Sequence, residues 1–434
     1  MPAPETRSQP SGRAVPAGPR QPGSLPRLLP AEFAAGPASL AGHLVRYGPP
    51  PSPGLTGQQR SELLAEVERS GLTGRGGAGF PAARKMAAVA GGRGAVVVAN
   101  GTEGEPASAK DKVLLARSPH LVLDGAALAA EIVGARTAVI VAHHSVREIV
   151  AEAATARASA AFDKVRFRII TAARGFVAGE ASAVVHWAGR GVPTPTATPP
   201  RLAERGLGGT PTLVQNVETL AHLALIARYG ACWFRSVGTP REPGSMLVTV
   251  LGGVREPSVL EVAIGTPVSE ILDLAGGPSG PLRALLLGGY FGTWADAEAA
   301  ATAPFSAAGL ADLGAGIGAG LIAVLPDAAC GLAETARVVR YLADQSAGQC
   351  GPCLFGLDAI AGQVQQLADG RTTDPGPLVR WLGQVDGRGA CRHPDGAVRL
   401  VRSALEQFTD ELGFHGRGRC SGTARVLPVP PGRK

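Results

Sequence analysis

The sequence has few aromatic residues and no long apolar run, and both shortages exclude broad classes of protein. Aromatics make up only 4% of the 434 residues, so aromatic stacking cannot be a widespread means of ligand binding. No apolar run approaches the roughly 20 residues needed to cross a bilayer. The basic N-terminus contains prolines but no apolar segment of the kind found in a secretory signal. We therefore expect a cytoplasmic protein with reduced thiols and no direct membrane insertion.

Cysteine is scarce as well. Six cysteines in 434 residues cannot form a disulfide framework, so cysteines that lie close together are expected to bind metal or to carry redox chemistry. Cys232 and Cys330 lie in apolar stretches and are expected to be small core residues.

Much of the net charge of +7 lies near the two ends, where Arg recurs among Pro and Gly. We expect flexible tails at 1–35 and 416–434. Neither tail interleaves aromatics with its basic residues, so nucleic-acid binding is not expected. A docking arm for an acidic partner protein remains open.

The sequence does contain alternating β-branched runs and Ala-rich helical segments between residues 36 and 240. The runs predict strands at 95–100, 137–144 and 165–172. Helical spacing is present at 60–71, 124–133, 146–162 and 216–230, the last with Asn216 as its N-cap. This alternation predicts an α/β domain with a parallel sheet over 36–240.

The pattern changes at about residue 240. Apolar runs at 245–254, 283–290 and 319–326, with a helical piece at 268–275, predict a small α+β domain over 241–328. Helical patterns then follow at 331–344, 354–369, 376–383 and 396–412. They predict a helical bundle over 329–415.

Two loops of the first domain have the composition of a ligand site. Gly74, Gly76 and Gly79 match G-x-G-x-x-G, but they follow a predicted helix, so an ordinary Rossmann turn is a poor interpretation. Glycines still allow backbone amides to approach a phosphate, and Arg75 and Lys85 add positive charge. The alternative is a turn without a ligand.

The second loop, 99–112, leaves the carboxyl end of the strand at 95–100. Ligands of open α/β sheets bind at this edge. Asn100, Thr102, Glu103 and Glu105 are polar residues that could hydrogen-bond a ribityl chain or a ring edge. A solvated turn is the alternative, and the neighbouring glycine loop favours a functional interpretation.

Cys350 and Cys353 lie in "QSAGQCGPCLFG" and could form a metal clamp or a dithiol switch. Pro352 is a good helix-opening residue, which places Cys353 near a helix N-terminus, where a thiolate is favoured. A thioredoxin-like dithiol should open the first helix after a strand, but here a helix and a loop precede it. Three cysteines with His393 could also bind zinc, which nothing else in the sequence indicates.

These loops, in this order, resemble the flavoprotein subunit of respiratory complex I and the diaphorase subunit of NAD-linked hydrogenases and formate dehydrogenases. The resemblance covers about residues 40 to 412. It rests on "SGLTGRGGAGFP", "NGTEGEP" with the following "KDK" and "PHLVLDG", "GEASA", "GLGGTPTLVQNVETLA" and "CGPC" with a distant Cys.

The resemblance implies a Rossmann-like FMN-binding domain, a ubiquitin-like β-grasp (soluble-ligand-binding) domain and a C-terminal helical bundle with an iron–sulfur site. The implied activity is hydride transfer from NADH to FMN, followed by single-electron transfer to a [4Fe–4S] cluster. The implied partners are other redox subunits or ferredoxin-like carriers, through which the protein would lie peripheral to a membrane.

The resemblance also assigns residues. Glu105 and Glu180 are the implied catalytic residues. The implied cofactor-binding residues are Gly74, Arg75, Gly76, Gly77, Gly79, Lys85, Asn100, Thr102, Glu103, Phe176, Gly179, Gln215, Asn216 and Thr219.

The chain departs from the family pattern at several of these positions. Thr102 replaces a usual Asp, Ala181 a usual Glu and Gln215 a usual Asn. Arg201 stands where the family has an aromatic residue and Thr198 where it has a Lys. FMN is therefore the firmer expectation, and NAD(H) is a further candidate. The electron donor could instead be reduced ferredoxin or another subunit.

The family's cluster motif is C-x-x-C-x-x-C with a fourth Cys about 40 residues further on, and Ala347 occupies its first position. Cys420 is then the first candidate for the missing ligand, with His393 next. A [4Fe–4S] cluster, a [3Fe–4S] cluster and a lost cluster are the alternatives, and we expect a retained one. The implied metal ligands are Cys350, Cys353, Cys391 and Cys420. The competing hypothesis for the whole chain is a non-enzymatic scaffold that keeps the fold.

Overall fold

The first sheet is parallel, with its four strands in the order β3-β2-β1-β4. The computed structural model describes residues 25–50, 54–196 and 198–430. The strands are β1 (Val96–Gly101), β2 (Thr137–Ala142), β3 (Arg166–Thr171) and β4 (Thr212–Asn216). Apart from their ends, β1 and β2 are buried, as expected for a parallel sheet covered on both faces.

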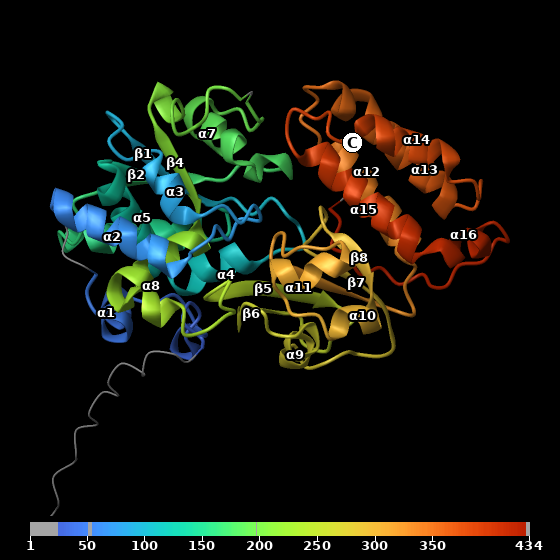
Figure 1. Cartoon of the computed structure of the whole chain (residues 1–434), viewed down its shortest axis with the longest axis horizontal. Helices are drawn as coiled ribbons and strands as arrows, with labels where there is room; N and C mark the ends of the chain where they lie inside the picture. Colours follow the sequence, from blue (N-terminus) through green and yellow to red (C-terminus); the bar gives the residue numbers. More distant parts are fainter. Residues whose placement is uncertain (1–24, 51–53, 197, 431–434) are drawn as a thin grey trace, which may run out of the picture.

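Helices cover both faces of this sheet (Figure 1). One face packs mainly against α4 (Lys110–Arg117), α5 (Pro119–Val133), α6 (Arg147–Ser159) and α8 (Val217–Phe234). The other face packs against α7 (Ala181–Arg190) through a small cluster of valines. The remaining helices of this domain are α1 (Leu40–Tyr47), α2 (Gly57–Ser70) and α3 (Ala82–Ala87).

The second sheet is mixed and has the order β6-β5-β9-β7-β8. Its strands are β5 (Ser245–Gly252), β6 (Ser258–Ala263), β7 (Leu282–Leu287), β8 (Thr293–Asp296) and β9 (Leu321–Pro326). β5 and β9 pair in parallel, while β5–β6, β7–β8 and β7–β9 are antiparallel. One face is covered by α9 (Val268–Leu274), α10 (Ala297–Ala301) and α11 (Ala307–Leu310).

The C-terminal part is helical. It contains α12 (Gly331–Asp344), α13 (Leu357–Ala368), α14 (Gly376–Val385), α15 (His393–Gln407) and α16 (Thr409–His415). A short π-helical segment, η5 (Pro352–Gly356), leads into α13. Short 3₁₀ turns elsewhere are η1 (Ala31–Phe33), η2 (Val177–Gly179), η3 (Leu207–Gly209) and η4 (Ala311–Leu313).

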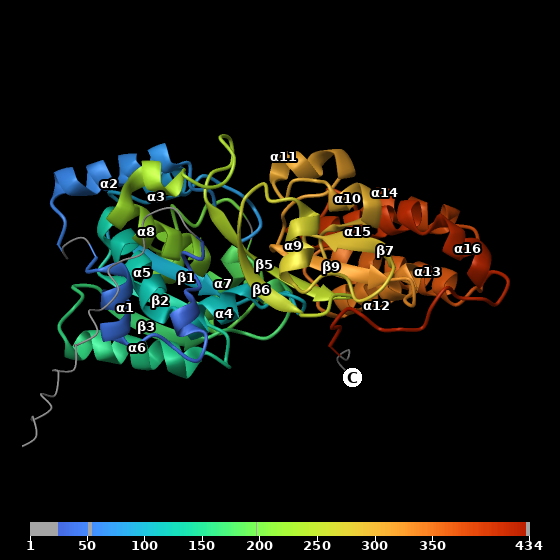
Figure 2. The same ribbon diagram turned by 90° about the horizontal axis from the view of Figure 1, so that it is seen from below.

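The parallel-sheet domain lies at one end of the molecule, and the mixed sheet and the helical part lie beside each other toward the other end (Figure 1 and Figure 2). Leu286, Trp294 and Ala323 of that sheet share one hydrophobic core with Leu332 and Val338 of α12. The bundle and the mixed sheet are therefore packed on a common core.

The expectation of loose tails is wrong for the described residues near both ends. Leu28 is fully buried, and the backbone amides of Arg27 and Leu28 donate to Glu261 of β6 at 2.7 and 2.6 Å. Near the C-terminus, Leu427 is buried and its amide donates to Glu334 of α12 at 2.8 Å. Residues 1–24 and 431–434 of the expected tails lie outside the described residues.

The predicted fold class is confirmed: a parallel-sheet domain, a small mixed-sheet domain and a helical domain follow in the expected order. Strands β4, β6 and β8 were not predicted. Within the described residues, no single helix has the length and apolar composition needed to span a membrane. The helices α4 and α5 together have this length and composition, but they are sharply bent at the break between them.

Candidate functional site

The glycine loop lies over the start of α8, at the carboxyl ends of β1 and β4. Its ends are held together because the Gly74 amide donates to the Phe80 carbonyl at 2.9 Å. The Arg75 amide donates to Thr219 Oγ1 at 2.9 Å, which ties the loop to α8. A Cβ on Gly76 would lie 3.3 Å from Asn216 Cβ, so the loop packs closely on the N-cap of α8. Gly77 has φ 99°, a conformation that favours glycine.

The Arg75 guanidinium was expected to bind cofactor, and the structure gives it a structural position instead. It is buried and donates to the carbonyls of Thr73, Pro243 and Ser245 at 3.1 to 3.4 Å. These bonds join the glycine loop to the start of β5. Arg75 therefore holds two domains together, and its charge is not directed at a phosphate.

A buried ion network lies next to the loop and was not predicted. Lys110 Nζ donates to Asp111 Oδ1 and Glu218 Oε2, both at 2.8 Å. Glu218 Oε1 accepts from the Leu247 amide of β5 at 2.8 Å, and Asp111 Oδ2 accepts from Asn216 Nδ2 at 2.7 Å. The paired carboxylates raise the pKa of Lys110 in spite of its burial. The charged residues in "KDK" and "NVE" were the available sequence signal for this network.

The acidic loop begins with residues that shape the backbone. Asn100 Nδ2 donates to the Gly179 carbonyl at 3.0 Å. Glu103 accepts from the amides of Asp111 and Lys112 at 3.0 and 3.1 Å, so its carboxylate caps α4. Glu103 also has φ 45°, which is rare outside glycine and is common near functional sites. Both carboxylate oxygens of Glu103 are therefore used in capping α4, whereas the sequence predicted that Glu103 contacts a cofactor.

Glu105 is buried between the first domain and the mixed sheet. Its Oε2 accepts from the Tyr290 amide at 3.0 Å. Burial raises the pKa of Glu105 to about 8, and the hydrogen bonds from Tyr290 and Ala107 only partly oppose this rise. The carboxyl group is therefore largely protonated at neutral pH and can donate a hydrogen bond.

Three buried polar atoms in this region have no hydrogen-bond partner among the described residues. They are Thr102 Oγ1, Glu105 Oε1 and Gln215 Nε2. Asn100 and Asn216 are register partners at the carboxyl ends of β1 and β4, and the three residues that carry these atoms belong to the segments at that edge of the sheet. Buried polar groups are normally paired, which makes this edge a candidate for a polar ligand.

Glu180 and Lys85 belong to a second wall of the site. Glu180 Oε2 accepts from the amides of Ser182 and Ala183 at 2.8 and 3.0 Å, so the expected catalytic carboxylate caps α7. Burial lowers the pKa of Lys85, and the nearby Glu180 opposes this effect. Lys85 on α3 and Glu180 on α7 thus face the same space.

Aromatic rings connect this site with the helical domain. Phe176 stacks on Tyr290 with 6.4 Å between ring centroids and contacts Phe291 at 4.7 Å. It also meets Tyr341 of α12 at 6.3 Å and His393 of α15 at 5.7 Å. Because Tyr290 binds Glu105 and His393 is close in sequence to Cys391, this ring cluster lies between the acidic loop and the cysteines.

Cys350, Cys353 and Cys391 are brought together. Burial and the neighbouring Cys350 and Cys391 raise the pKa of Cys353 to about 12. The backbone of Ala347 also contacts Cys353, so the alanine lies beside the three thiols. The side chains of Cys350 and Cys353 interact directly, and Cys391 is close enough to influence Cys353.

Cys420 is not part of this group. It lies beside Cys330, Glu411 and His415, near the start of α12. Cys350 follows the other end of α12, whose 14 residues span roughly 20 Å at 1.5 Å per residue. The expectation that Cys420 completes the cluster is therefore wrong.

Two further cysteine expectations have different outcomes. Cys232 is exposed, so the prediction of a core position for it is wrong. Cys330 is buried as expected, although polar groups surround it.

His393 is the other candidate named for the cluster. Its Nε2 lies 2.7 Å from the Leu342 carbonyl, which fixes the proton on Nε2. Its buried Nδ1 has no partner among the described residues, so this nitrogen keeps a free lone pair.

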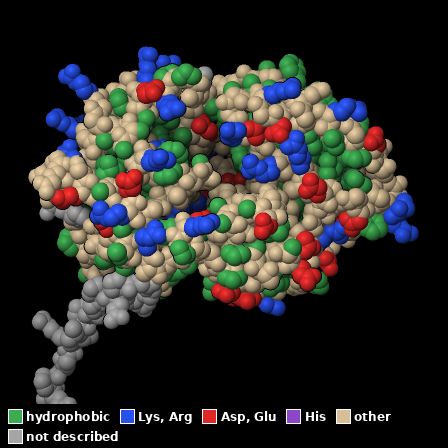
Figure 3. Space-filling model, viewed as in Figure 1, with side chains coloured by type: hydrophobic (Ala, Val, Ile, Leu, Met, Phe, Trp, Pro, Cys, Tyr) green, Lys and Arg blue, Asp and Glu red, His purple; other side chains and the backbone are tan. Residues whose placement is uncertain are grey.

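A hollow opens between the first domain and the helical domain and is bordered by charged side chains (Figure 3). Phe80 of the glycine loop is 52% exposed. It offers an aromatic face beside the loop, which the sequence comparison with the family pattern did not single out.

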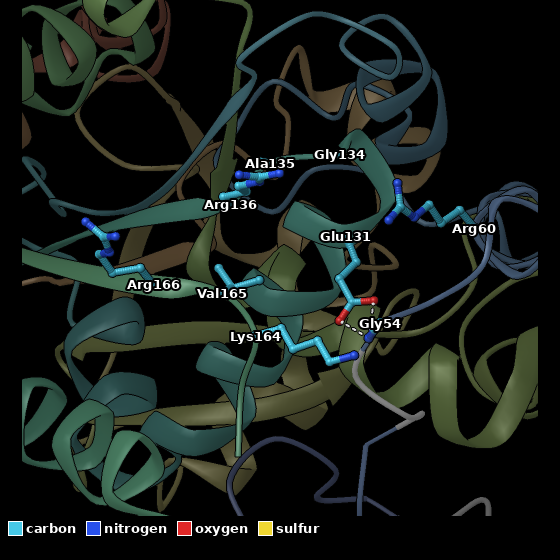
Figure 4. Close-up of a pocket in the computed structure, with 9 residues that line it drawn as sticks. All are labelled: Gly54, Arg60, Glu131, Gly134, Ala135, Arg136, Lys164, Val165 and Arg166. Carbon is cyan, nitrogen blue, oxygen red and sulfur yellow. Dashed lines mark hydrogen bonds between the residues drawn. The ribbon is translucent and has the colours of Figure 1, made fainter. Parts of the chain in front are cut away.

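A separate cavity of about 570 Å³ lies at the amino ends of β2 and β3 (Figure 4). Arg60, Arg136, Lys164 and Arg166 line it, and Glu131 accepts from the Gly54 amide at 3.0 Å. This is the edge opposite to the one where ligands of open α/β sheets bind. The loops at the carboxyl edge therefore remain the candidate site.

Three family descriptions match the chain. Residues 67–225 match the Nuo51 FMN-binding domain, 247–299 the SLBB domain and 333–415 the NADH-ubiquinone oxidoreductase-F iron-sulfur binding region. The matched ranges follow the order of the parallel-sheet, mixed-sheet and helical parts.

Whole-chain similarity agrees with these matches. The F 2 subunit of the NADH-quinone oxidoreductase of Rhizobium meliloti is 30% identical over 375 residues, covering 82% of this chain and 88% of that protein. The corresponding F subunit of Streptomyces coelicolor is 29% identical over 380 residues, covering 82% and 84%. A chain of the NAD⁺-reducing [NiFe]-hydrogenase in its H₂-reduced state has a TM-score of 0.75 and 30% identity. That match covers 81% of this chain and 63% of the hydrogenase chain.

Proposed function

The chain belongs to the family of NADH-quinone oxidoreductase F subunits, and on that premise we propose that it passes electrons between a donor, FMN and an iron–sulfur cluster. The observation that carries the proposal is the set of unpartnered buried polar atoms on Thr102, Glu105 and Gln215. A polar ligand at the carboxyl edge of the sheet would satisfy them.

The residues of this edge fit FMN. The glycine loop packs closely on α8 while its residues 76–79 are exposed, so their backbone amides would be within reach of a phosphate, and Lys85 adds a positive charge to the same space. FMN, when bound, supplies the exchange between two-electron and one-electron transfer. The protein's contribution is to orient the ring and to control its surroundings. Glu105, held protonated by burial, would donate a hydrogen bond from Oε1 to a ring or ribityl acceptor.

Cys350, Cys353 and Cys391 would hold the cluster, with Ala347 at the position of the missing ligand. For the fourth ligand of a cubane, we propose His393 Nδ1 in place of Cys420. The hydrogen bond from Nε2 to the Leu342 carbonyl supports this choice, because it leaves the lone pair on Nδ1. A [3Fe–4S] cluster on the three cysteines is the alternative.

NADH is the proposed donor, with Phe80 of the motif "SGLTGRGGAGFP" as the stacking surface. Arg201, at the family's aromatic position, is exposed. Phe80 is also exposed and lies within the glycine loop, so it could stack on a planar ring of the dinucleotide. Such an interaction contributes about 0.5–1.5 kcal/mol.

The proposal keeps the expected domains at 36–240, 241–328 and 329–415 and adds the packed segments 25–35 and 416–430 to them. The proposed partners are redox subunits or ferredoxin-like carriers. The proposed location is the cytoplasm, peripheral to a membrane where partner subunits provide the attachment.

The experiment is to prepare the full chain anaerobically with FMN, iron and sulfide and to record its visible and electron paramagnetic resonance spectra. We expect flavin bands, a broad iron–sulfur absorption and a paramagnetic signal after reduction. His393→Ala should convert a cubane signal into a three-iron signal, whereas Cys420→Ser should leave the spectrum unchanged. A colourless protein after reconstitution would exclude the proposal in favour of a scaffold.

The choice of donor is tested by mixing this preparation with NADH and following flavin bleaching. Phe80→Ala should raise the NADH concentration for half-maximal rate about 2- to 10-fold, the range that corresponds to the stacking energy. Bleaching by dithionite but not by NADH would retain the flavoprotein and reject NADH as its donor.

A further inference from the structure

Four metal-ligating side chains meet at the start of α12, away from the cluster cysteines. The ligand atoms of Cys330, Glu411, His415 and Cys420 all lie within 4.8 Å of one another. Cys330 Sγ is 3.4 Å from His415 Nε2, and that nitrogen is 3.3 Å from Glu411 Oε2. Two sulfurs, one nitrogen and one oxygen are therefore close enough together to surround a single ion.

The group is built into the fold. Cys330 is the N-cap residue of α12, and its sulfur accepts from the Ala333 amide at 3.3 Å. Glu411 and His415 are four residues apart on α16, which places both side chains on one face of the helix. Cys330, Glu411 and His415 are buried, and Cys420 closes the group from the solvent side.

Glu411 supplies an independent sign of a missing partner. Its carboxylate is fully buried, and Oε2 makes no hydrogen bond within the described residues, although it lies toward His415. Its other oxygen accepts from Arg283 at 2.8 Å and from Ser421. One oxygen is thus held in place and the other is left free to bind a ligand.

The charges suit a divalent cation. Two thiolates, one carboxylate and a neutral imidazole around a 2+ ion leave a net charge of −1, which the Arg283 guanidinium offsets. Sulfur, nitrogen and oxygen ligands in a closed set of four are typical of structural zinc.

We propose that Cys330, Glu411, His415 and Cys420 form a structural zinc site that fastens the C-terminal segment 416–430 to the start of α12. The chain around the site supports a fastening role. Ala424 donates to the Ala328 carbonyl at 3.1 Å, and Leu427 is buried against the helical domain. Zinc would join α12, α16 and this segment at one point.

The test measures zinc in the full chain, loaded with its iron–sulfur cluster and washed with a weak chelator, by mass spectrometry of the metals. We expect about one zinc per chain, as for a closed structural site. Cys420→Ser should lower the retained zinc at least ~10-fold, since affinity depends on each ligand. Cys420 is exposed, so this variant should fold, and Cys232→Ser is the matched control at another exposed cysteine.

Two readouts separate this site from zinc bound in place of the cluster. Zinc K-edge absorption should report two sulfur ligands per zinc, and Cys350→Ser should leave the zinc content unchanged. Removal of zinc by a strong chelator should speed trypsin cleavage after Arg425. Equal zinc content in the native chain and in Cys420→Ser would overturn the proposal, as would a Cys330–Cys420 disulfide in the anaerobically prepared protein.

Discussion

At the residue scale, Glu105 shows how burial sets the chemistry of the candidate site. Its pKa is raised from the ordinary 4.5 to about 8 by burial, so the folded protein binds a proton that the unfolded chain releases. This contribution to stability is full below about pH 4.5 and is lost as the pH rises through 8. At 1.36 kcal/mol per unit, the loss between pH 5 and pH 8 is at most about 4 kcal/mol.

Glu105→Gln should therefore flatten the pH dependence of the free energy of unfolding over this range. The measurement is urea unfolding of the FMN-free chain at several pH values, compared with the native sequence. Glu148→Gln, at an exposed position of α6, is the control and should leave the slope as it is. Equal slopes for the native chain and Glu105→Gln would mean that Glu105 is ionised in the fold.

At the level of single residues, the sequence predicted the location of the candidate site better than the orientation of its side chains. The motifs directed attention to two loops that the fold brings to the carboxyl edge of the sheet, because glycines and acidic residues at the end of a strand indicate a ligand edge. They did not give the direction of each side chain. Arg75 binds the carbonyls of Pro243 and Ser245, which are distant in the sequence and are brought near only by the fold. Glu180 caps a helix through local amides, a role that the motif did not distinguish from catalysis. Cys420 lies near the start of α12, whereas Cys350 and Cys353 follow its end, and the motif spacing could not show this separation.

At the element scale, the strands with a continuous apolar pattern were predictable, and β4, β6 and β8 were not. β1 and β2 are β-branched runs with turn residues at both ends, so their pattern is local. β8 has only four residues, and β4 follows a proline and ends at the N-cap of α8. β6 is an edge strand that contains Glu261, a charge that interrupts its apolar pattern and that the amides of Arg27 and Leu28 bind.

At this scale, the C-terminal segment 416–430 depends on close packing of Gly422 against Ala328. A Cβ on Gly422 would lie 2.0 Å from the Ala328 carbonyl oxygen, so Gly422→Ala must shift the segment away from α12. Overpacking costs about 1–3 kcal/mol, which should raise the rate of trypsin cleavage after Arg425 roughly 5-fold or more. Peptide mass mapping during limited proteolysis gives this rate.

Gly413→Ala is the control for this experiment. Its added methyl group would meet only the flexible end of Arg417, at 3.7 Å. Cleavage after Arg425 should then match the native chain. Unchanged cleavage in Gly422→Ala would mean that the segment does not depend on its close packing against Ala328.

At the scale of the whole molecule, the order of the domains defines a direction for electron transfer. The glycine and acidic loops lie on the first domain, and the ring cluster around Phe176 leads to the cysteines of the helical domain. Leu354 and Phe355 follow Cys353 directly and are 52% and 70% exposed. Exposed apolar side chains beside a redox centre favour the docking of a protein acceptor.

The double variant Leu354→Ser, Phe355→Ser should therefore slow transfer to a protein acceptor and spare transfer to a small one. With a soluble [2Fe–2S] ferredoxin as the probe, we expect the ratio of kcat to KM to fall about 10-fold, equivalent to 1.4 kcal/mol of lost docking energy. Ferricyanide needs no docking surface, so its reduction should stay the same. Val45→Ser on α1 removes an equally exposed side chain from the distant end of the molecule and should change neither rate. A parallel loss with both acceptors would indicate damage to the cluster, and no loss with ferredoxin would place the exit for electrons elsewhere.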